Sequence, residues 1–348
     1  GSLRPSAPVP RPPSSPLPLP PYESLEPALL LARRLDLPLL VDLRDPWALD
    51  ENRVYPTAWH RKREIRRMGR HFASCTRVLW NCREACSAAR EAWPRLPDDL
   101  FATLPNGFDE EDFRNVDATH EDKFRLTHVG FLHAAKGLRV RQRSGWLRGL
   151  GGELWPIDFL GRSHFYLLQA LARVQDRHPE WKDRWELRLV GPGSDVDIDL
   201  IDKSGLADHV RLTGYVTHER AVQELVDAEA LFLPHHGLPG GNRARTVPGK
   251  VYEYLRSGRP ILGALPAGDA RDLTEGRQGG FAVDPDDVDG MGLWIETEME
   301  RFFSLGREPD LDPAGLEQFE RRELTKRLAA EFSSLLAGDA HATAEAGS

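Results

Sequence analysis

The most informative segment of the 348-residue chain is Val247-Pro-Gly-Lys-Val-Tyr-Glu-Tyr-Leu-Arg-Ser-Gly-Arg-Pro-Ile-Leu-Gly263. Pro248 suits the first turn of a helix, where its missing N–H costs nothing, and Gly258 is a typical helix stop. The free N–H groups at the start of such a helix favour an anion, and Lys250 adds a full positive charge beside them. We therefore interpret the segment as a phosphate-facing helix start that is followed by a buried strand.

Two interpretations of this helix remain open. Glu253 lies one turn after Lys250, so its carboxylate can take the two hydroxyls of a ribose if a nucleotide binds there. Alternatively, the helix is an ordinary amphipathic one, with Val251 and Leu255 on its core side and Lys250 and Glu253 as a surface pair.

Similar strand-and-glycine patterns precede this segment. Apolar runs that contain a glycine at or near the carboxyl end occur at residues 127–132, 185–193 and 209–216. Residues 105–109 predict a turn, and residues 221–234 predict a helix that runs into a strand. In this order the segments resemble the donor-binding half of a GT-B glycosyltransferase, closest to family four, whose members use nucleotide sugars with retention. The resemblance covers residues 22–336.

The resemblance implies which residues hold the donor. The diphosphate would lie between a glycine and a lysine, with an arginine close by that is either Arg139 or Arg162. The base would meet the backbone of the turn after residues 209–213, where glycines allow a close approach. The donor-binding residues implied in this way are Gly130, Lys136, Gly191, Gly214, Tyr215, Arg245, Gly249, Lys250 and Glu253.

Position 245 departs from the family pattern. The family places two glutamates eight residues apart, and Glu253 matches the second of them, the one expected on the ribose. Arg245 stands where the first glutamate would touch the donor sugar. We expect Arg245 either to meet phosphate, a role that suits a guanidinium group, or to lie in a solvated glycine-rich loop. The departure bears on sugar recognition and on activity.

The predicted fold class is α/β and GT-B-like, with two Rossmann-type doubly wound parallel sheets, the first one shortened. An uninterrupted apolar run at residues 37–43 is typical of a parallel strand that is buried on both faces. Residues 133–162 resemble an insertion before a helix at residues 164–173. We predict a Pro-rich irregular start at residues 1–21, a partial acceptor domain at 22–104 and a donor domain at 105–312. A helix at 313–337 then crosses back to the first domain, and residues 338–348 form a tail.

Two features of the first domain are candidates for function. Arg44 and Asp45 follow a predicted strand directly, and ligands of open α/β sheets bind at such strand ends. Some envelope-polysaccharide glycosyltransferases carry a similar Arg-Asp-Pro-Trp motif, so both residues are catalytic candidates, unless they merely pair with each other. The helix at residues 58–72 favours contact with an anionic membrane or a lipid diphosphate, or is a solvated basic face. Its cations are Arg61, Lys62, Arg63, Arg66, Arg67 and Arg70.

Composition argues against several other classes. The net charge of −8 disfavours a general nucleic-acid binder, and no run of 18 apolar residues predicts a membrane span. Three cysteines fit a reduced, cytosolic chain. The aspartates at positions 195, 197 and 199 follow a Gly-Pro-Gly turn and predict an acidic helix start rather than a metal site. We predict neither a metal nor a resident cofactor.

We therefore expect a cytoplasmic, metal-independent hexosyltransferase, peripheral to the inner face of the membrane, that uses a UDP or GDP sugar and a glycan or lipid-linked acceptor. Two alternatives stay open: an inactive nucleotide- or partner-binding remnant of the fold, and a sugar-nucleotide epimerase. About 36 residues precede the strand at residues 37–43, fewer than a complete first domain needs. We also expect an exposed sheet edge that favours pairing in a homodimer.

Overall fold

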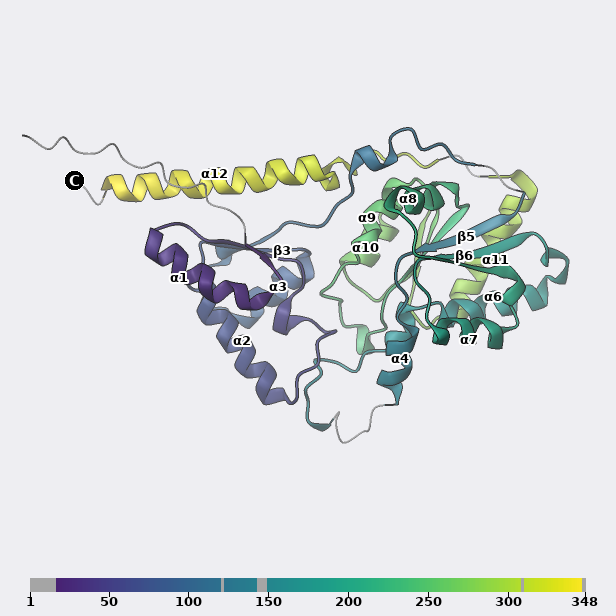
Figure 1. The fold of residues 1–348 in the computed structure, drawn as a ribbon, viewed down its shortest axis with the longest axis horizontal. Helices are drawn as coiled ribbons and strands as arrows, with labels where there is room; N and C mark the ends of the chain where they lie inside the picture. Colours follow the sequence, from purple (N-terminus) through teal and green to yellow (C-terminus); the bar gives the residue numbers. More distant parts are fainter. Residues whose placement is uncertain (1–16, 120–121, 143–148, 308–309, 346–348) are drawn as a thin grey trace, which may run out of the picture.

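The computed structural model describes residues 17–119, 122–142, 149–307 and 310–345. Two parallel sheets stand side by side, each covered by helices. The long helix α12 (Arg321–Glu345) follows the second domain in sequence but lies over the first (Figure 1). The predicted α/β class with two parallel sheets is confirmed.

The first sheet has the strand order β1-β2-β3-β4, and all its strands are parallel. Sequential order with right-handed crossovers places its three connecting helices on one face, and α12 covers the other. The elements are β1 (Leu17–Leu19), α1 (Leu25–Leu35), β2 (Leu40–Leu43), α2 (Ala58–Phe72), β3 (Arg77–Trp80), α3 (Arg83–Ala92) and β4 (Phe101–Thr103).

Local sequence explains most of these elements. The bounds of α1 and α2 agree with the apolar periodicity, and Thr57 caps α2 by accepting a hydrogen bond from the His60 N–H at 3.4 Å. The prediction of an irregular start is wrong for residues 17–19, which form β1 and pair with β2. Their prolines concealed the strand, because Pro is tolerated at the edge of a sheet. Residues 1–16 lie outside the described residues.

The second sheet has the strand order β10-β9-β8-β5-β6-β7, again all parallel. Its strands are β5 (Phe124–Val129), β6 (Trp185–Val190), β7 (Val210–Gly214), β8 (Ala230–Pro234), β9 (Ile261–Ala264) and β10 (Gly280–Val283). Its helices include α4 (Ala134–Arg141), α6 (Phe165–Arg177), α7 (Asp195–Ser204), α8 (His218–Asp227), α9 (Lys250–Arg256), α10 (Asp269–Glu275) and α11 (Val288–Leu305).

The expected insertion at residues 133–162 is partly wrong. A helix was expected only at residues 164–173, but α4 begins at Ala134, four residues after Gly130. Gly137 explains the poor periodicity, because this helical position packs so closely on Leu160 that a Cβ would come within 2.7 Å of its side chain. Residues 143–148 lie outside the described residues.

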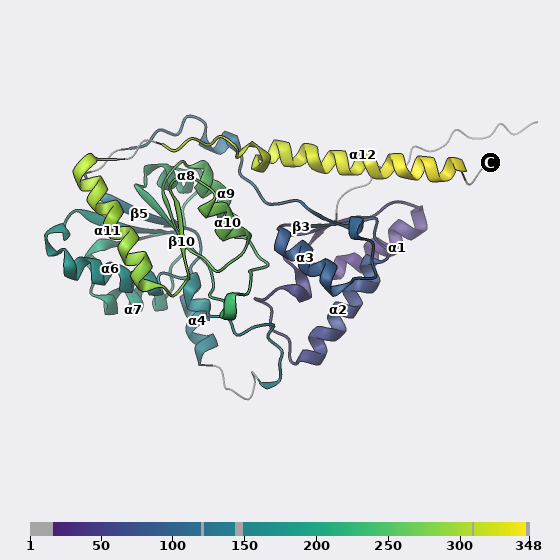
Figure 2. The ribbon, with the colours of Figure 1, turned by 180° about the vertical axis from the view of Figure 1, so that it is seen from behind.

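Three clusters of buried apolar side chains hold the layers together. One fills the space between the second sheet and the layer of α6 and α11. Figure 2 shows these two helices from behind. A second, smaller one lies between the first sheet and α12. The third is continuous from the α1–α3 side of the first domain to the α8–α10 side of the second. The carboxyl ends of the second sheet therefore face the first domain across a packed junction.

Candidate donor site

Three neighbouring strands of the second sheet end in glycines at the junction. Gly130 follows β5, Gly191 follows β6, and Gly214 ends β7, all with positive φ angles. The Gly130 N–H donates to the Val190 carbonyl at 2.8 Å, and Gly191 and Gly214 form an antiparallel bridge. A Cβ on Gly191 would lie 2.6 Å from the Gly130 carbonyl oxygen. The glycines therefore let these strand ends approach one another closely.

Lys250 at the start of α9 reaches the end of β5. A Cβ on Gly130 would lie 2.5 Å from Lys250 Nζ, so only glycine leaves room for the ammonium group. Lys250 Nζ lies 3.3 Å from Nε2 of His128, whose Nδ1 lies 3.0 Å from the Phe232 carbonyl oxygen. Because that carbonyl accepts the Nδ1 proton, Nε2 is the acceptor for Lys250. Burial keeps the pKa of His128 well below its usual range, so the ring is neutral.

The pKa of Lys250 is lowered to about 7. Burial is the main cause, Arg162 lowers it further, and Glu253 opposes the shift. The side chain nevertheless keeps part of its surface accessible. An amine that is costly to charge in the free protein will gain strongly from an anion that binds beside it.

Lys136 on α4 and Arg162 complete a cation cluster with Lys250. Lys136 Nζ lies 3.8 Å from the centroid of the Phe159 ring. Burial lowers the pKa of both Lys136 and Arg162, and Arg162 lowers that of Lys136 further. None of the three cations forms an ion pair with a carboxylate of the described residues. Of the two arginines left open by the sequence, Arg162 belongs to this cluster, whereas Arg139 is exposed and its Nε donates to the Ala135 carbonyl of its own helix.

Acidic groups of the first domain face this cluster. They lie in the loop after β2, at Asp45, Asp50 and Glu51, and all three favour the charged form of Arg162. Burial and the neighbouring Asp50 raise the pKa of Asp45, while Arg162 lowers it. Asp45 is exposed, so it is accessible to a ligand in the junction. It does not pair with Arg44, which contacts Asp42 and Asn106 instead, at 2.6 and 2.9 Å.

A cavity of about 500 Å³ lies beside the cluster, between the two domains and α12. The Glu253 carboxylate faces it without a hydrogen bond to any described residue, and burial raises its pKa. The predicted residues Arg44, Gly249 and Glu253 thus share one cavity with Arg321, which no sequence pattern singled out. Its lining is Arg44, Leu104, Pro105, Asn106, Gly107, Gly249, Glu253, Arg321, Leu324, Thr325 and Leu328.

The other predicted donor residues do not line this cavity, and two of them, Tyr215 and Arg245, have surroundings of their own. Tyr215, after β7, is 89% exposed and is free to stack on a ligand. Arg245 turns toward the first domain: its Nη1 donates to the Leu49 carbonyl at 3.3 Å, and its guanidinium lies over Trp155. Neither expectation for Arg245, phosphate contact or a solvated loop, matches these contacts.

The expectation of six surface cations on α2 is wrong for Arg61. Arg61 is buried and donates to the carbonyls of Ala48, Asp50 and Gly152, at 2.7, 3.2 and 3.3 Å, and to that of Arg53. Arg67 pairs with Glu26 of α1. The remaining cations of the helix are exposed, and together with Trp59 they form what we call the α2 outer stripe: Trp59, Lys62, Arg63, Arg66 and Arg70.

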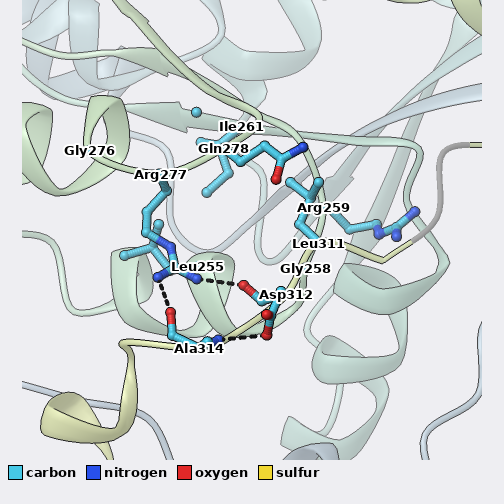
Figure 3. A pocket seen from close by; sticks show the side chains of 11 residues that line it. Leu255, Gly258, Arg259, Ile261, Gly276, Arg277, Gln278, Leu311, Asp312 and Ala314 are labelled. Carbon is cyan, nitrogen blue, oxygen red and sulfur yellow. Dashed lines mark hydrogen bonds between the residues drawn. The ribbon is translucent and has the colours of Figure 1, made fainter.

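Other candidate sites have structural explanations. Asp197 forms a capping box with Ser194 at the start of α7, as the acidic helix start predicted. Within the described ranges, no three metal-ligating side chains are grouped to hold an ion, and no helix is both long and apolar enough to cross a membrane. A cavity of about 240 Å³ lies at the amino ends of β9 and β10, opposite the donor site. Figure 3 shows Arg277 closing it through the carbonyls of Asp312 and Ala314.

The chain is similar to known glycosyltransferases in sequence and in fold. Residues 159–296 match the family model "Glycosyl transferases group 1". This segment includes Arg162, Lys250 and Glu253. No curated protein matches the chain in sequence.

Solved structures extend the likeness to most of the chain. HepE of Anabaena, in complex with UDP and glucose, has a TM-score of 0.63 and 17% identity, covering 92% of this chain and 78% of its own. Sucrose-phosphate synthase from Thermosynechococcus elongatus has a TM-score of 0.58 and 14% identity, covering 90% and 72%. The apo lipopolysaccharide outer core galactosyltransferase WaaB has a TM-score of 0.54 and 15% identity, covering 90% and 73%. The predicted GT-B-like fold with a shortened first domain is confirmed, as is the resemblance to GT-B glycosyltransferases.

Proposed function

We propose that the chain moves a hexose from a nucleoside diphosphate sugar to a glycan or lipid-linked acceptor, with retention and without a metal ion. The observation that carries the proposal is the cation cluster of Lys136, Arg162 and Lys250. Lys250 lies at the end of β5, Arg162 is within electrostatic reach of both lysines, and none of the three forms an ion pair with a carboxylate among the described residues. A diphosphate would supply the missing negative charge.

The cluster suits the chemistry of the reaction. When the bond between the sugar and the diphosphate breaks, negative charge grows on the leaving group, and fixed cations in a partly buried site stabilise that charge strongly. Lys250 is held by a neutral His128, so it is already positioned before the donor binds. Three cations give the leaving group the neutralisation that a metal ion provides in other enzymes.

The remaining candidate residues receive roles around the diphosphate. Glu253 faces the junction cavity without a hydrogen bond to a described residue, and we assign it to the ribose hydroxyls. Asp45 belongs to the facing first domain and lies within electrostatic reach of Arg162, and we assign it to the donor sugar or the acceptor hydroxyl. Arg44 lines the same cavity as Glu253 and is an acceptor or sugar contact. Exposed Tyr215 and Gly214 are the contacts for the base.

We further propose a cytoplasmic protein that contacts the inner face of the membrane through the α2 outer stripe. Its four cations and Trp59 combine attraction to anionic lipid with an aromatic side chain suited to the interface. Sedimentation with vesicles that contain phosphatidylserine tests this. Changing Lys62, Arg63, Arg66 and Arg70 to glutamate should abolish binding to the vesicles. Unchanged binding would refute the proposed membrane contact of the stripe.

One observation favours a second candidate, an inactive nucleotide-binding remnant. Arg245 occupies the position of the glutamate expected on the donor sugar, and its side chain is directed to the first domain. Such a protein would bind a nucleotide but would not transfer a sugar. Release of the nucleotide from its sugar separates the two candidates, because only the enzyme carries it out.

The first test is thermal unfolding with millimolar UDP, GDP, ADP and their sugars. UDP comes first because HepE was solved with UDP. A nucleotide at about 100 times its Kd adds about 2.7 kcal/mol of stability, which shifts the melting temperature visibly. A shift that is lost in Lys250→Ala supports the donor site, and release of nucleotide from its sugar then identifies the enzyme. No shift with any nucleotide would refute the proposed function.

A further inference from the structure

Arg245 makes polar contacts across the junction between the two domains. The Arg245 N–H donates to Glu51 Oε1 at 3.1 Å, and its carbonyl accepts from Cys82 Sγ at 3.2 Å. Its guanidinium donates to the Leu49 carbonyl. Glu51, Cys82 and Leu49 all belong to the first domain. The residue that departs from the family pattern therefore binds the facing domain through its amide, its carbonyl and its side chain.

Glu51 is the central first-domain residue of these contacts. Its side chain is 1% exposed, and Oε1 accepts hydrogen bonds from the Arg245 N–H and from Thr246 Oγ1, the latter at 3.0 Å. Nε2 of the fully buried His236 lies 3.4 Å from the same oxygen. A buried carboxylate is costly unless such partners hold it, and all three of these partners belong to the second domain.

A second contact fixes the domains at α3. Cys82, at the N-cap of α3, makes no capping hydrogen bond with its side chain. Asp269 of the second domain replaces it: Oδ2 accepts from the Glu84 N–H at 3.1 Å, and Oδ1 pairs with Arg83 Nε at 2.9 Å. Arg243 also bridges the domains, from Asp272 to Glu84. Glu51 and Asp269 thus hold the domains on two sides of the segment at residues 243–246.

Closure places the loop after β2 over the cation cluster. Glu51 is only six residues from Asp45 in this loop, and both are within electrostatic reach of Arg162. The polar contacts of Glu51 go to residues 236, 245 and 246 of the second domain. Losing them would release the loop, and with it Asp45, from its place opposite the donor site.

We infer that Glu51 is a positioning residue for the proposed transfer, which holds the first domain over the donor through Thr246 and the Arg245 backbone. The inference rests on the proposed function for its catalytic part. The nucleotide contacts lie on the second domain, whereas Asp45 lies on the first. Opening the junction should therefore slow transfer and leave nucleotide binding intact.

The test compares Glu51→Ala with Glu51→Gln and with Glu23→Ala, an exposed first-domain carboxylate that serves as the control. For Glu51→Ala we expect kcat to fall roughly 100-fold, the scale of a misplaced reacting group. We expect the UDP Kd to change much less than kcat, because the proposed nucleotide contacts lie on the second domain. The radius of gyration from X-ray scattering should increase. Glu51→Gln keeps an oxygen acceptor and should recover most of kcat.

Two outcomes would overturn the inference: a wild-type kcat and radius of gyration in Glu51→Ala, or a UDP Kd that weakens in step with kcat. If Glu51→Ala does not fold, Thr246→Val removes one of the same hydrogen bonds from the other domain, and the same readouts apply. A wild-type chain that binds no nucleotide would refute the proposed function instead. Scattering would then still decide whether Glu51 holds the domains together.

Discussion

Lys250 makes donor binding depend on pH. Its pKa of about 7 in the free protein must rise when a diphosphate binds beside it, so above neutral pH binding takes up a proton. We expect UDP affinity to fall as pH rises from about 7 to about 9, by up to about tenfold per pH unit. Calorimetry in two buffers of different ionisation enthalpy measures the proton uptake directly.

The same shift affects stability with a defined sign. Between the native pKa and the ordinary value of 10.5, the unfolded chain binds more protons at Lys250 than the native one. The contribution of Lys250 therefore raises the stability of the free protein as pH rises through this window.

The variant Lys250→Arg tests the pH dependence of binding. Because arginine stays protonated, this variant should bind UDP with little dependence on pH. A wild-type affinity that is flat between about pH 7 and 9 would contradict this prediction.

Glu253 should recognise the nucleoside rather than the phosphates. Glu253→Ala removes hydrogen bonds to the ribose and should weaken UDP binding by about 1–3 kcal/mol. Pyrophosphate lacks a ribose, so its affinity should change little. Calorimetric titration of both ligands into wild type, Glu253→Ala and Glu253→Gln measures the difference. Equal losses for UDP and pyrophosphate would show that Glu253 acts on the phosphates or on the fold.

The places of single residues in the fold were predictable where they follow from neighbours in sequence. Lys250 and Glu253 lie in one helix, and Gly130 follows a recognisable strand. Arg162 could not be separated from Arg139, because the segment between them lacks a clear period. Nothing pointed to Glu51, since its partners lie almost 200 positions away and contact it only across the junction. A polar His128 within an apolar strand was a signal that could have been used.

The helix α3 depends on the second domain for its cap. Asp269→Ala leaves the first turn without a carboxylate partner and should lower the free energy of unfolding by about 1 kcal/mol, within a range of about 0.5–2. Urea unfolding measures the loss. Asp289→Ala is the matched control, because Asp289 is exposed and pairs with Arg173 at the surface; it should stay within about 0.5 kcal/mol. Equal effects of the two variants would argue against the cap.

The helix α2 combines a structural arginine with an exposed stripe. Arg61→Ala removes a buried guanidinium that donates to four backbone carbonyls and should cost about 1–3 kcal/mol in chemical denaturation. Arg66→Ala, one face away, should stay within about 0.5 kcal/mol. A similar loss in both would mean that Arg61 is no more important than a surface cation.

Elements were predictable where one physical pattern dominates. The helix predicted at residues 58–72 has the bounds of α2, and the apolar run at residues 37–43 contains β2. β1 was missed because the neighbouring prolines favour irregular structure. The bounds of α12 differ from the prediction of residues 313–337, since its amino end is fixed by a bridge between Phe108 and Glu320 that the local sequence does not encode.

At the scale of the whole molecule, alternating strands and helices predicted two parallel sheets, but not how the domains meet. The junction combines the apolar cluster that both domains share with the contacts of Glu51 and Asp269. The homodimer remains a prediction that light scattering can test. The edge strand β1 has three residues and includes Pro18, a combination that limits pairing with another chain.

The helix α12 physically belongs to the first domain, although it follows the second in sequence. Leu324 packs with Leu40, Leu79 and Leu104 of the first sheet, so that the sheet is covered on both faces. Leu324→Ala should lower the free energy of unfolding by about 2 kcal/mol, at the low end for such a change because Leu328 stays in place. Hydrogen exchange should accelerate in β2 and β3 but not in β5 and β6. The control Leu305→Ala removes a side chain that is 80% exposed and should change neither. Faster exchange in the second sheet alone would contradict the assignment, because it would mean that α12 stabilises the domain it follows rather than the one it covers.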